Sequence, residues 1–376
     1  HYNLGLISKA AGELNDALSS FTKVAKLKPD LAEAHISIGA ILHEQGQTTA
    51  AIASLKKALS YQPNSAQALS NLGNSLCNLG DLEAAVNALQ RAISIDPNYA
   101  EAHNNLGLAL QKTGNLSAAI SSFETALHLK KMFPEALSNL GLTLQEKGEI
   151  KNAISSFNAA LQLNPYLVEV KSNLAMAQLL HGDYQQGLEN YEFRFSTKTG
   201  LNALLNKPKF SQWDGRDLKS GQKLLLISEQ GLGDTSHFMR YAIILRQRGL
   251  DVNLCAQPKL HSLIRASGID SSPIPPEEIT DSEDAHWLPL LSILRHLRVT
   301  ADDPIISDPY IKAPDLLMMT WKERLSSERR PIIGINWQGN PSHETTNSKG
   351  RSLPLETFAP IVQKTNASLL SLQKGF

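Results

Sequence analysis

Apolar and small residues recur at a fixed interval of 34 positions through the first half of the chain. The large side chains of this series are Phe21, Leu55, Leu89, Phe123, Phe157 and Tyr191, and four residues before most of them stand Ala17, Ala51, Ala85, Ala119 and Ala153. Two glycine series keep the same interval: Gly5, Gly39, Gly73, Gly107 and Gly141, and Gly12, Gly46, Gly80, Gly114, Gly148 and Gly182. A pair of helices cannot bury its apolar face alone, so the pattern predicts stacked helix pairs, an all-α solenoid over residues 1–195.

Each position of the repeat has a physical role. The first glycine lets the first helix of each pair, helix A, approach the second, helix B, closely, and the second glycine ends helix A. The small alanine of helix B leaves room for a large side chain of a neighbouring helix. Pro29, Pro63, Pro97 and Pro165 stop helix B, but Lys131 replaces the expected proline of the fourth repeat. The last repeat carries Gly187 and Arg194 at small core positions and is expected to act as a terminal cap. These positions resemble the tetratricopeptide repeat.

Asparagine recurs two residues before the first glycine of each repeat. The series is Asn3, Asn71, Asn105, Asn139 and Asn173, with Ser37 as the exception. In tetratricopeptide repeats helix A lines the concave surface, so these side chains are expected to form a ladder of amides that binds the backbone of an extended peptide. Similar ladders line the repeats of O-linked N-acetylglucosamine transferase. The alternative interpretation is that asparagine only keeps an exposed helix face soluble.

The helical period lapses over residues 196–221, which are expected to form an ordered connector. Residues 223–228 and 251–256 then read as buried strands, and residues 235–249 and 258–268 as helices, which together predict a parallel sheet in a Rossmann-like domain over residues 222–328. The acidic, proline-containing stretch at residues 273–286 is expected to be a surface loop. A second Rossmann-like domain is expected to start at residue 329 and to be incomplete at residue 376.

The stretch SEQGLGDTSHFMRY, residues 228–241, follows the first predicted strand. It lacks the third glycine of a dinucleotide site and the GK[ST] of a phosphate-binding loop, so Gly231 and Gly233 indicate only a tight turn. The stretch resembles the first turn of heptosyltransferase-like GT-B glycosyltransferases, whose Gly-Asp and following His correspond to Asp234 and His237. Residues 330–362 resemble the start of the second domain of that family, with Arg351 as its basic residue and Lys349 beside it.

The resemblance implies transfer of a sugar from a nucleotide-sugar donor. Asp234 would be the general base, Glu229 an alternative base, and His237 would orient the acceptor, although a histidine on a helix often has only a structural role. Gly231, Gly233, Lys349 and Arg351 would contact the donor, with Arg351 clamping its phosphate. Asn336, Gln338 and Asn340 would line the cleft. No metal or further cofactor is implied, and the chain of 376 residues is expected to be inactive.

Composition narrows the classes of partner. Lys plus Arg and Asp plus Glu both number 36, so no basic surface for nucleic acid is expected. No stretch has the apolar length of a membrane span, no signal peptide is recognisable, and the two cysteines suit neither a disulfide framework nor a metal site, which favours the cytoplasm. The chain opens on HYNLG and reads as a fragment. Two alternatives to a transferase remain: a non-catalytic scaffold for protein binding, and a protein O-N-acetylglucosaminyltransferase.

Overall fold

The chain forms two compact units, His1–Arg194 and Phe195–Phe376. In the computed structural model the described residues are 1–197, 204–216, 218, 222–229, 231–280, 284–300, 302–303, 308–328, 331–335, 355–358, 360–361 and 368–371.

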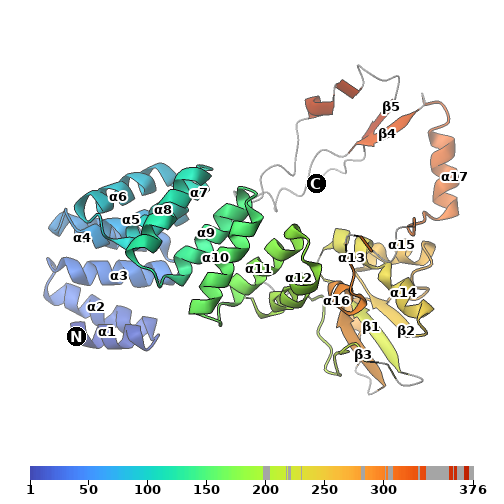
Figure 1. Ribbon diagram of the computed structural model, residues 1–376, viewed down its shortest axis with the longest axis horizontal. Coiled ribbons are helices and arrows are strands. Elements are labelled where there is room, and N and C mark those ends of the chain that lie inside the picture. Colours follow the sequence, from blue (N-terminus) through green and yellow to red (C-terminus); the bar gives the residue numbers. More distant parts are fainter. Residues whose placement is uncertain are drawn as a thin grey trace. The chain divides into compact units, whose positions relative to one another are not determined.

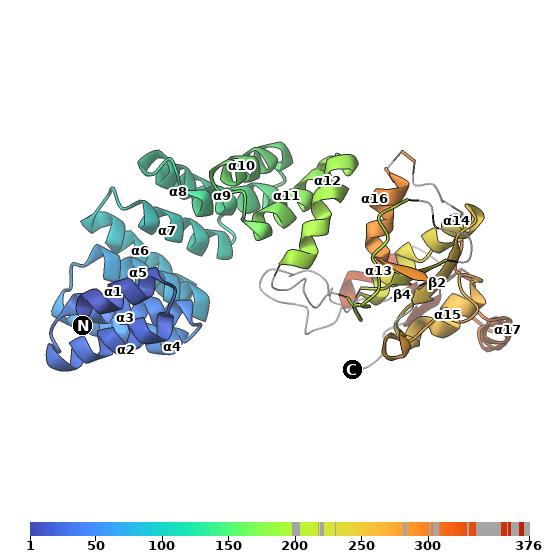
Figure 2. The same cartoon turned by 90° about the horizontal axis from the view of Figure 1, so that it is seen from below.

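The first unit is a row of six antiparallel helix pairs (Figures 1 and 2). The first helix of each pair, helix A, is α1 (Tyr2–Ala10), α3 (Ala32–Glu44), α5 (Ala66–Leu79), α7 (Ala100–Lys112), α9 (Pro134–Glu146) and α11 (Val168–His181). The second, helix B, is α2 (Leu14–Leu27), α4 (Thr48–Tyr61), α6 (Leu82–Ile95), α8 (Leu116–Leu129), α10 (Ile150–Leu163) and α12 (Tyr184–Tyr191), after which the 3₁₀ turn η1 spans Glu192–Ser196. The predicted solenoid is confirmed.

The two glycine series have the two roles that the sequence predicts. A Cβ added to Gly107 would lie 2.6 Å from a ring carbon of Phe123, and the first glycine of the other repeats faces the bulky residue of its own helix B in the same way. The second series takes positive φ, from 76° at Gly46 to 92° at Gly80, which is the left-handed conformation that ends a helix. The glycines therefore set both the helix spacing and the helix ends.

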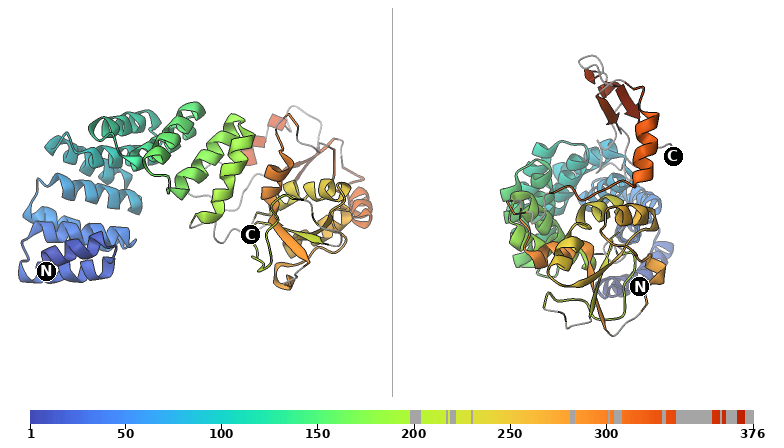
Figure 3. Two further views of the ribbon diagram at one scale, coloured as in Figure 1. Left: turned by 60° about the horizontal axis from the view of Figure 1, so that its bottom comes forward. Right: turned by 90° about the vertical axis from the view of Figure 1, so that its right-hand side faces the viewer.

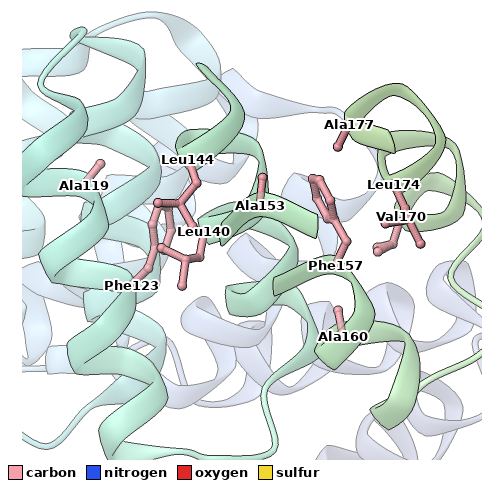
Figure 4. Packing of buried hydrophobic residues seen from close by; sticks show 10 residues of the cluster. All are labelled: Ala119, Phe123, Leu140, Leu144, Ala153, Phe157, Ala160, Val170, Leu174 and Ala177. Carbon is pink, nitrogen blue, oxygen red and sulfur yellow. The ribbon is translucent and has the colours of Figure 1, made fainter. Parts of the chain in front are cut away.

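The repeats share a continuous apolar core. Figure 4 shows ten residues of one cluster, in which Phe123 comes together with Leu140 and Leu144, while Phe157 belongs to the next repeat. Phe123 and Phe157 are fully buried. Such stacking makes the stability of each repeat depend mainly on its neighbours.

The ends of the helices show what the prolines do. Helix α8 ends at Leu129, in register with the other B helices, although Lys131 replaces the proline. Packing therefore ends this helix without help from proline.

After the last pair, Arg194 is buried. It donates to the carbonyl of Tyr191 at 3.1 Å and to Glu192 Oε1 at 2.9 Å, and it lies over the Tyr191 ring. These contacts close the final pair with polar groups.

The second unit contains two small parallel sheets. Strands β1 (Lys223–Ile227), β2 (Asp251–Cys255) and β3 (Ala285–Pro289) form the first in the order β2-β1-β3, with Leu225 of β1 opposite Asn253 and Trp287. Strands β4 (Ile332–Ile335) and β5 (Ser368–Ser371) form the second. The described helices are α13 (Leu232–Phe238), α14 (Tyr241–Gln247), α15 (His261–Ala266), α16 (Ile293–Leu297) and α17 (Asp315–Arg324), and Figure 3 shows several of them beside the first sheet. Short 3₁₀ turns are η3 (Pro258–Leu260), η4 (Pro276–Glu278), η5 (Leu290–Ser292) and η7 (Leu355–Phe358).

Two sequence predictions for this unit were wrong in detail. The helix predicted over residues 235–249 begins at Leu232 and breaks at Met239, where Ala242 and Ile243 donate to the third residue back instead of the fourth. The loop predicted over residues 273–286 contains the start of β3 and a bridge between Ile274 and Cys255, because Ala285 and its apolar neighbours are buried beside β1. The parallel pairing of β1 with β2 is as predicted, whereas β3 was not predicted. In the described residues the expected Rossmann-like domain amounts to this small three-stranded sheet and its short helices.

Candidate functional site

The A helices form the inner layer of the first unit. The successive A helices α3, α5, α7, α9 and α11 lie against one another, whereas successive B helices touch less. A row of helix pairs in which one layer is more closely spaced curves towards that layer. The asparagine ladder lies on this inner layer, because all its members belong to A helices.

The ladder residues in the middle repeats are tied to their neighbours. Asn105 Nδ2 donates to Ser70 Oγ at 3.1 Å, and Asn139 Nδ2 donates to Asn104 Oδ1 at 3.0 Å. Each of these amides therefore donates a hydrogen bond to the preceding A helix, which the sequence did not predict. By contrast, the side chains of Asn3, Asn71 and Asn173 make no hydrogen bond within the described part of the chain, and Asn71 and Asn173 are half-buried.

A histidine joins the second and third repeats on the same layer. His43 Nε2 lies 3.2 Å from Asn74 Nδ2 and 3.3 Å from Asn78 Nδ2, and because an amide nitrogen only donates, this ring nitrogen accepts. Its Nδ1 donates at 3.1 Å to Ser75 Oγ, whose own proton goes to the carbonyl of Asn71. The network therefore holds the imidazole neutral, and burial lowers the pKa of His43 while the charge of Glu44 opposes the shift.

Further polar groups continue this surface into the fourth and fifth repeats. Lys112 Nζ donates to the carbonyl of Cys77 at 3.3 Å, and Gln111 Nε2 donates to Glu146 Oε2 at 3.2 Å. In the described part of the chain, the buried Oε1 of Gln145 accepts no hydrogen bond. The A-helix layer consequently offers amides, carbonyl oxygens and carboxylates, which are the groups that recognise a polypeptide backbone.

The turn after β1 is a second candidate site. Glu229 is 7% exposed, and its backbone carbonyl accepts from Gln257 Nε2 at 2.8 Å. The Oε1 of the same Gln257 accepts from the buried Thr235 hydroxyl at 3.0 Å. Gln257 therefore links the turn to helix α13.

Asp234 lies at the start of α13, and its side chain is exposed. Gly231 is the N-cap of that helix, and a side chain there would collide with the Asp234 carboxylate. Gly233 has no neighbour within 4 Å of an added Cβ, and neither glycine takes positive φ. Gly233 therefore lies within α13 and not in a turn, and Gly231 precedes that helix as its N-cap with an ordinary negative φ.

His237 belongs to a small aromatic and basic cluster that the sequence did not reveal. Arg240 donates from Nε to the carbonyl of His237 at 2.8 Å and from Nη2 to the Tyr310 hydroxyl at 3.1 Å. The Tyr310 hydroxyl in turn donates to the carbonyl of Ser236 at 2.5 Å. The pKa of His237 is lowered by burial and by the charge of Arg240, against the opposing effect of Asp234. Tyr310 lies 73 residues from His237, which explains why local sequence patterns missed it.

Several predicted site residues cannot be placed. Asn336, Gln338, Asn340, Lys349 and Arg351 lie outside the described residues. Among the residues that are described, no group of three or more metal-ligating side chains comes together, and no helix combines the length and apolar character needed to cross a bilayer. A cavity of about 480 Å³ lies between α8 and α10, over the buried Leu140 and Leu144 of α9.

The repeats match a known family. Residues 1–199, just over half of the chain, match the model of the cilia and flagella-associated protein 70 C-terminal domain, a tetratricopeptide-repeat family. The chain belongs to this family. The assignment of the repeats as tetratricopeptide repeats is thereby confirmed.

Individual relatives match about half of the chain. Protein FlbA of Caulobacter vibrioides is 26% identical over 218 residues, which cover 52% of this chain and 35% of that protein, so the chain spans about a third of the relative's length. The structure of MamA is 30% identical and covers 44% of this chain and 97% of MamA, with a TM-score of 0.36. The Cut9 and Hcn1 complex of APC/C is 19% identical and covers 52% of this chain and 39% of that one, with a TM-score of 0.50. The likeness to the Cut9 and Hcn1 complex shows a similar fold alone, and none of these three proteins is named as a glycosyltransferase.

Proposed function

We propose that this protein is a binding scaffold whose A-helix layer holds an extended segment of another polypeptide. The observation that carries the proposal is the row of amides along that layer, in which Asn71 and Asn173 have side chains with no hydrogen-bond partner in the described chain. Asparagine is a mediocre helix former, so its recurrence on one helix face needs a reason other than helix stability. Each such amide offers two donors and an acceptor, which match a peptide's carbonyl and N–H groups.

The half-buried state of these amides supports binding over mere solubility. If these amides served only to keep the surface soluble, their partial burial would bring no benefit. If a bound peptide covers them, they lose less contact with water on binding, because part of their surface is already shielded. The inter-repeat bonds of Asn105 and Asn139 fix those side chains in place, which lowers the entropy lost when a ligand binds.

The test uses peptides selected from a random 15-residue display library on the whole chain. The pair Asn71→Ala and Asn173→Ala removes two unpartnered amides, and we expect selected peptides to bind about 2- to 10-fold more weakly for each amide lost. Asn105 and Asn139 are unsuitable for this test, because replacing them also breaks bonds between repeats. Isothermal titration calorimetry gives the dissociation constants.

The matched control is Asn87→Ala with Asn158→Ala. Both residues are exposed, lie on the B helices α6 and α10, and make no side-chain hydrogen bond in the described chain. The control is expected to leave affinity unchanged. Equal losses from the ladder pair and the control pair would return the ladder to the solubility interpretation.

A second candidate function is sugar transfer by the second unit, with a nucleotide sugar as donor. The observation that favours it is the position of Glu229 and Asp234 directly after β1, at the carboxyl end of a parallel sheet, where such sheets bind ligands. Asp234 is exposed and Glu229 is buried, so the proposal assigns the general base to Asp234. On the longest form of the protein, Asp234→Asn is expected to lower nucleoside diphosphate release from a panel of sugar nucleotides by about 100- to 10,000-fold, with Glu229→Gln as the paired variant. Unchanged release in a folded Asp234→Asn protein contradicts this candidate.

A further inference from the structure

The two helix layers of the first unit carry different charge. The six A helices contain six glutamates and three lysines and no other Asp or Arg. The six B helices contain six lysines or arginines and four aspartates or glutamates. The layer that carries the amide ladder is therefore the acidic one, although the chain as a whole has no net charge.

Four of the six glutamates form a row that follows the ladder. Glu33, Glu101, Glu135 and Glu169 each stand four residues before a ladder position, and Gln67 fills the remaining place. Residues at i and i+4 lie on one helix face, so the row runs beside the ladder along the same surface. Glu101 pairs with Lys130 at 2.8 Å, whereas Glu33, Glu135 and Glu169 are exposed and make no ion pair in the described chain.

Helix stability alone does not account for the row. A carboxylate in the first turn favours any helix through its dipole, and this effect acts equally on both layers. The two layers use it differently: four A helices have an uncharged N-cap and carry the carboxylate in the first turn, beside the ladder, whereas four B helices carry it as the N-cap, namely Glu13, Asp81, Glu149 and Asp183. The dipole alone does not explain why the A helices place it on the ladder face. The same layer also has an unpartnered polar atom: the buried side-chain oxygen of the half-buried Gln145 accepts no hydrogen bond in the described chain.

We infer that the bound segment is basic, with Lys or Arg side chains that reach the glutamate row while the ladder holds its backbone. This inference rests on the proposed binding function and names the chemistry of the partner. Charged groups across an interface mainly set which partner is accepted and how fast it associates. An acidic peptide or a nucleic-acid backbone would meet like charge along the whole row.

The experiment uses three fluorescein-labelled 15-residue probes of one Gly/Ser/Thr background that carry four Lys, four Gln or four Glu. Fluorescence anisotropy on the whole chain in 50 mM salt is expected to give a dissociation constant about 10-fold lower for the Lys probe than for the Gln probe. At 500 mM salt the ratio is expected to fall to about twofold, because salt screens exposed charges.

The variant Glu33→Gln, Glu135→Gln, Glu169→Gln is expected to abolish the preference for the Lys probe. Its control, Asp16→Asn, Glu83→Gln, Glu124→Gln, removes three carboxylates from B helices, two of them in first turns, and is expected to keep the preference. Circular dichroism checks folding, and Glu135→Gln alone, with an expected loss of about twofold, replaces the triple variant if that unfolds.

The outcomes separate the two proposals. Equal affinity for the Lys and Gln probes, a tighter Glu probe, or a preference that survives in the glutamate-row variant overturns the inference and leaves the binding function standing. If no probe and no selected peptide binds, the binding function fails as well.

Discussion

Single side chains decide how closely the helices of each repeat approach. The Cα of Gly107 faces the ring of Phe123, and the equivalent glycines face Phe21, Leu55, Leu89 and Phe157. The sequence predicts this relation because both residues recur at the same interval. The network around His43 was not predicted, since it depends on side-chain directions between helices about 31 to 35 residues apart.

Gly107→Ala is expected to destabilise the repeats by about 1–3 kcal/mol, because the added methyl lies 2.6 Å from Phe123 and a fully packed core cannot yield without strain. Thermal melting followed by circular dichroism at 222 nm measures the effect, which helices dominate. Ser121→Ala, an exposed change on α8, is the control and should leave the melting temperature nearly unchanged. If Gly107→Ala melts like the control, the close approach is not required.

The pKa of His43 in the folded chain is expected to lie below its ordinary value of 6.5 because of burial. In the unfolded chain the ordinary value applies. As the pH falls below 6.5, the unfolded state binds a proton that the folded state does not yet bind, so the free energy of unfolding decreases until the pH is below the folded pKa. The contribution of His43 to the free energy of unfolding is therefore fully present above pH 6.5. NMR titration of His43 measures the shift, and His43→Gln should remove its share of the pH dependence. A midpoint at or above 6.5 contradicts the network.

Local sequence patterns predict the ends of some helices and strands but not of others. The B helices end in register whether or not proline follows, as α8 demonstrates. Strand β3 was missed because its first residues belong to the acidic stretch that was interpreted as a surface loop, and the break between α13 and α14 has no glycine or proline to mark it. Helix boundaries that depend on packing are therefore predictable in a repeat, where neighbours give the register, and less so in the second unit.

Lys131→Pro is expected to stabilise the protein by about 0.4–1 kcal/mol, because proline restricts the unfolded chain. The preceding residue, Lys130, has φ −134° and ψ 91°, close to the −132° and 82° of Gln62, which precedes Pro63. The backbone N–H of Lys131 makes no hydrogen bond in the described chain. Urea unfolding measures the change, and a loss of stability would show that the fourth repeat does not share the backbone of the second.

At the scale of the whole molecule, the sequence predicts the solenoid because 34-residue periodicity specifies both its units and their contacts. The chemistry of the second unit is predicted less well, since Asn336, Lys349 and Arg351 lie outside the described residues and Asp234 and His237 rest on a short motif. We propose peptide binding by the first unit because its asparagine amides recur at a fixed interval along the A-helix layer, as the N–H and carbonyl groups of an extended peptide recur along its backbone.

Residues 1–195 are expected to fold without the rest of the chain, because each repeat contacts mainly its neighbours and the unit has its own core. Circular dichroism of this fragment should show a helical spectrum and a cooperative melt. A disordered spectrum would mean that the second unit is needed for the repeats to fold.

The most direct test of peptide binding on the A-helix layer is photo-crosslinking. A selected 15-residue peptide with a central photoreactive group is irradiated with the whole chain, and mass spectrometry locates the crosslinked residues. Crosslinks in α5, α7 and α9 that an excess of unlabelled peptide suppresses are the predicted result. Crosslinks confined to the B helices or to residues 195–376 would contradict peptide binding on this layer.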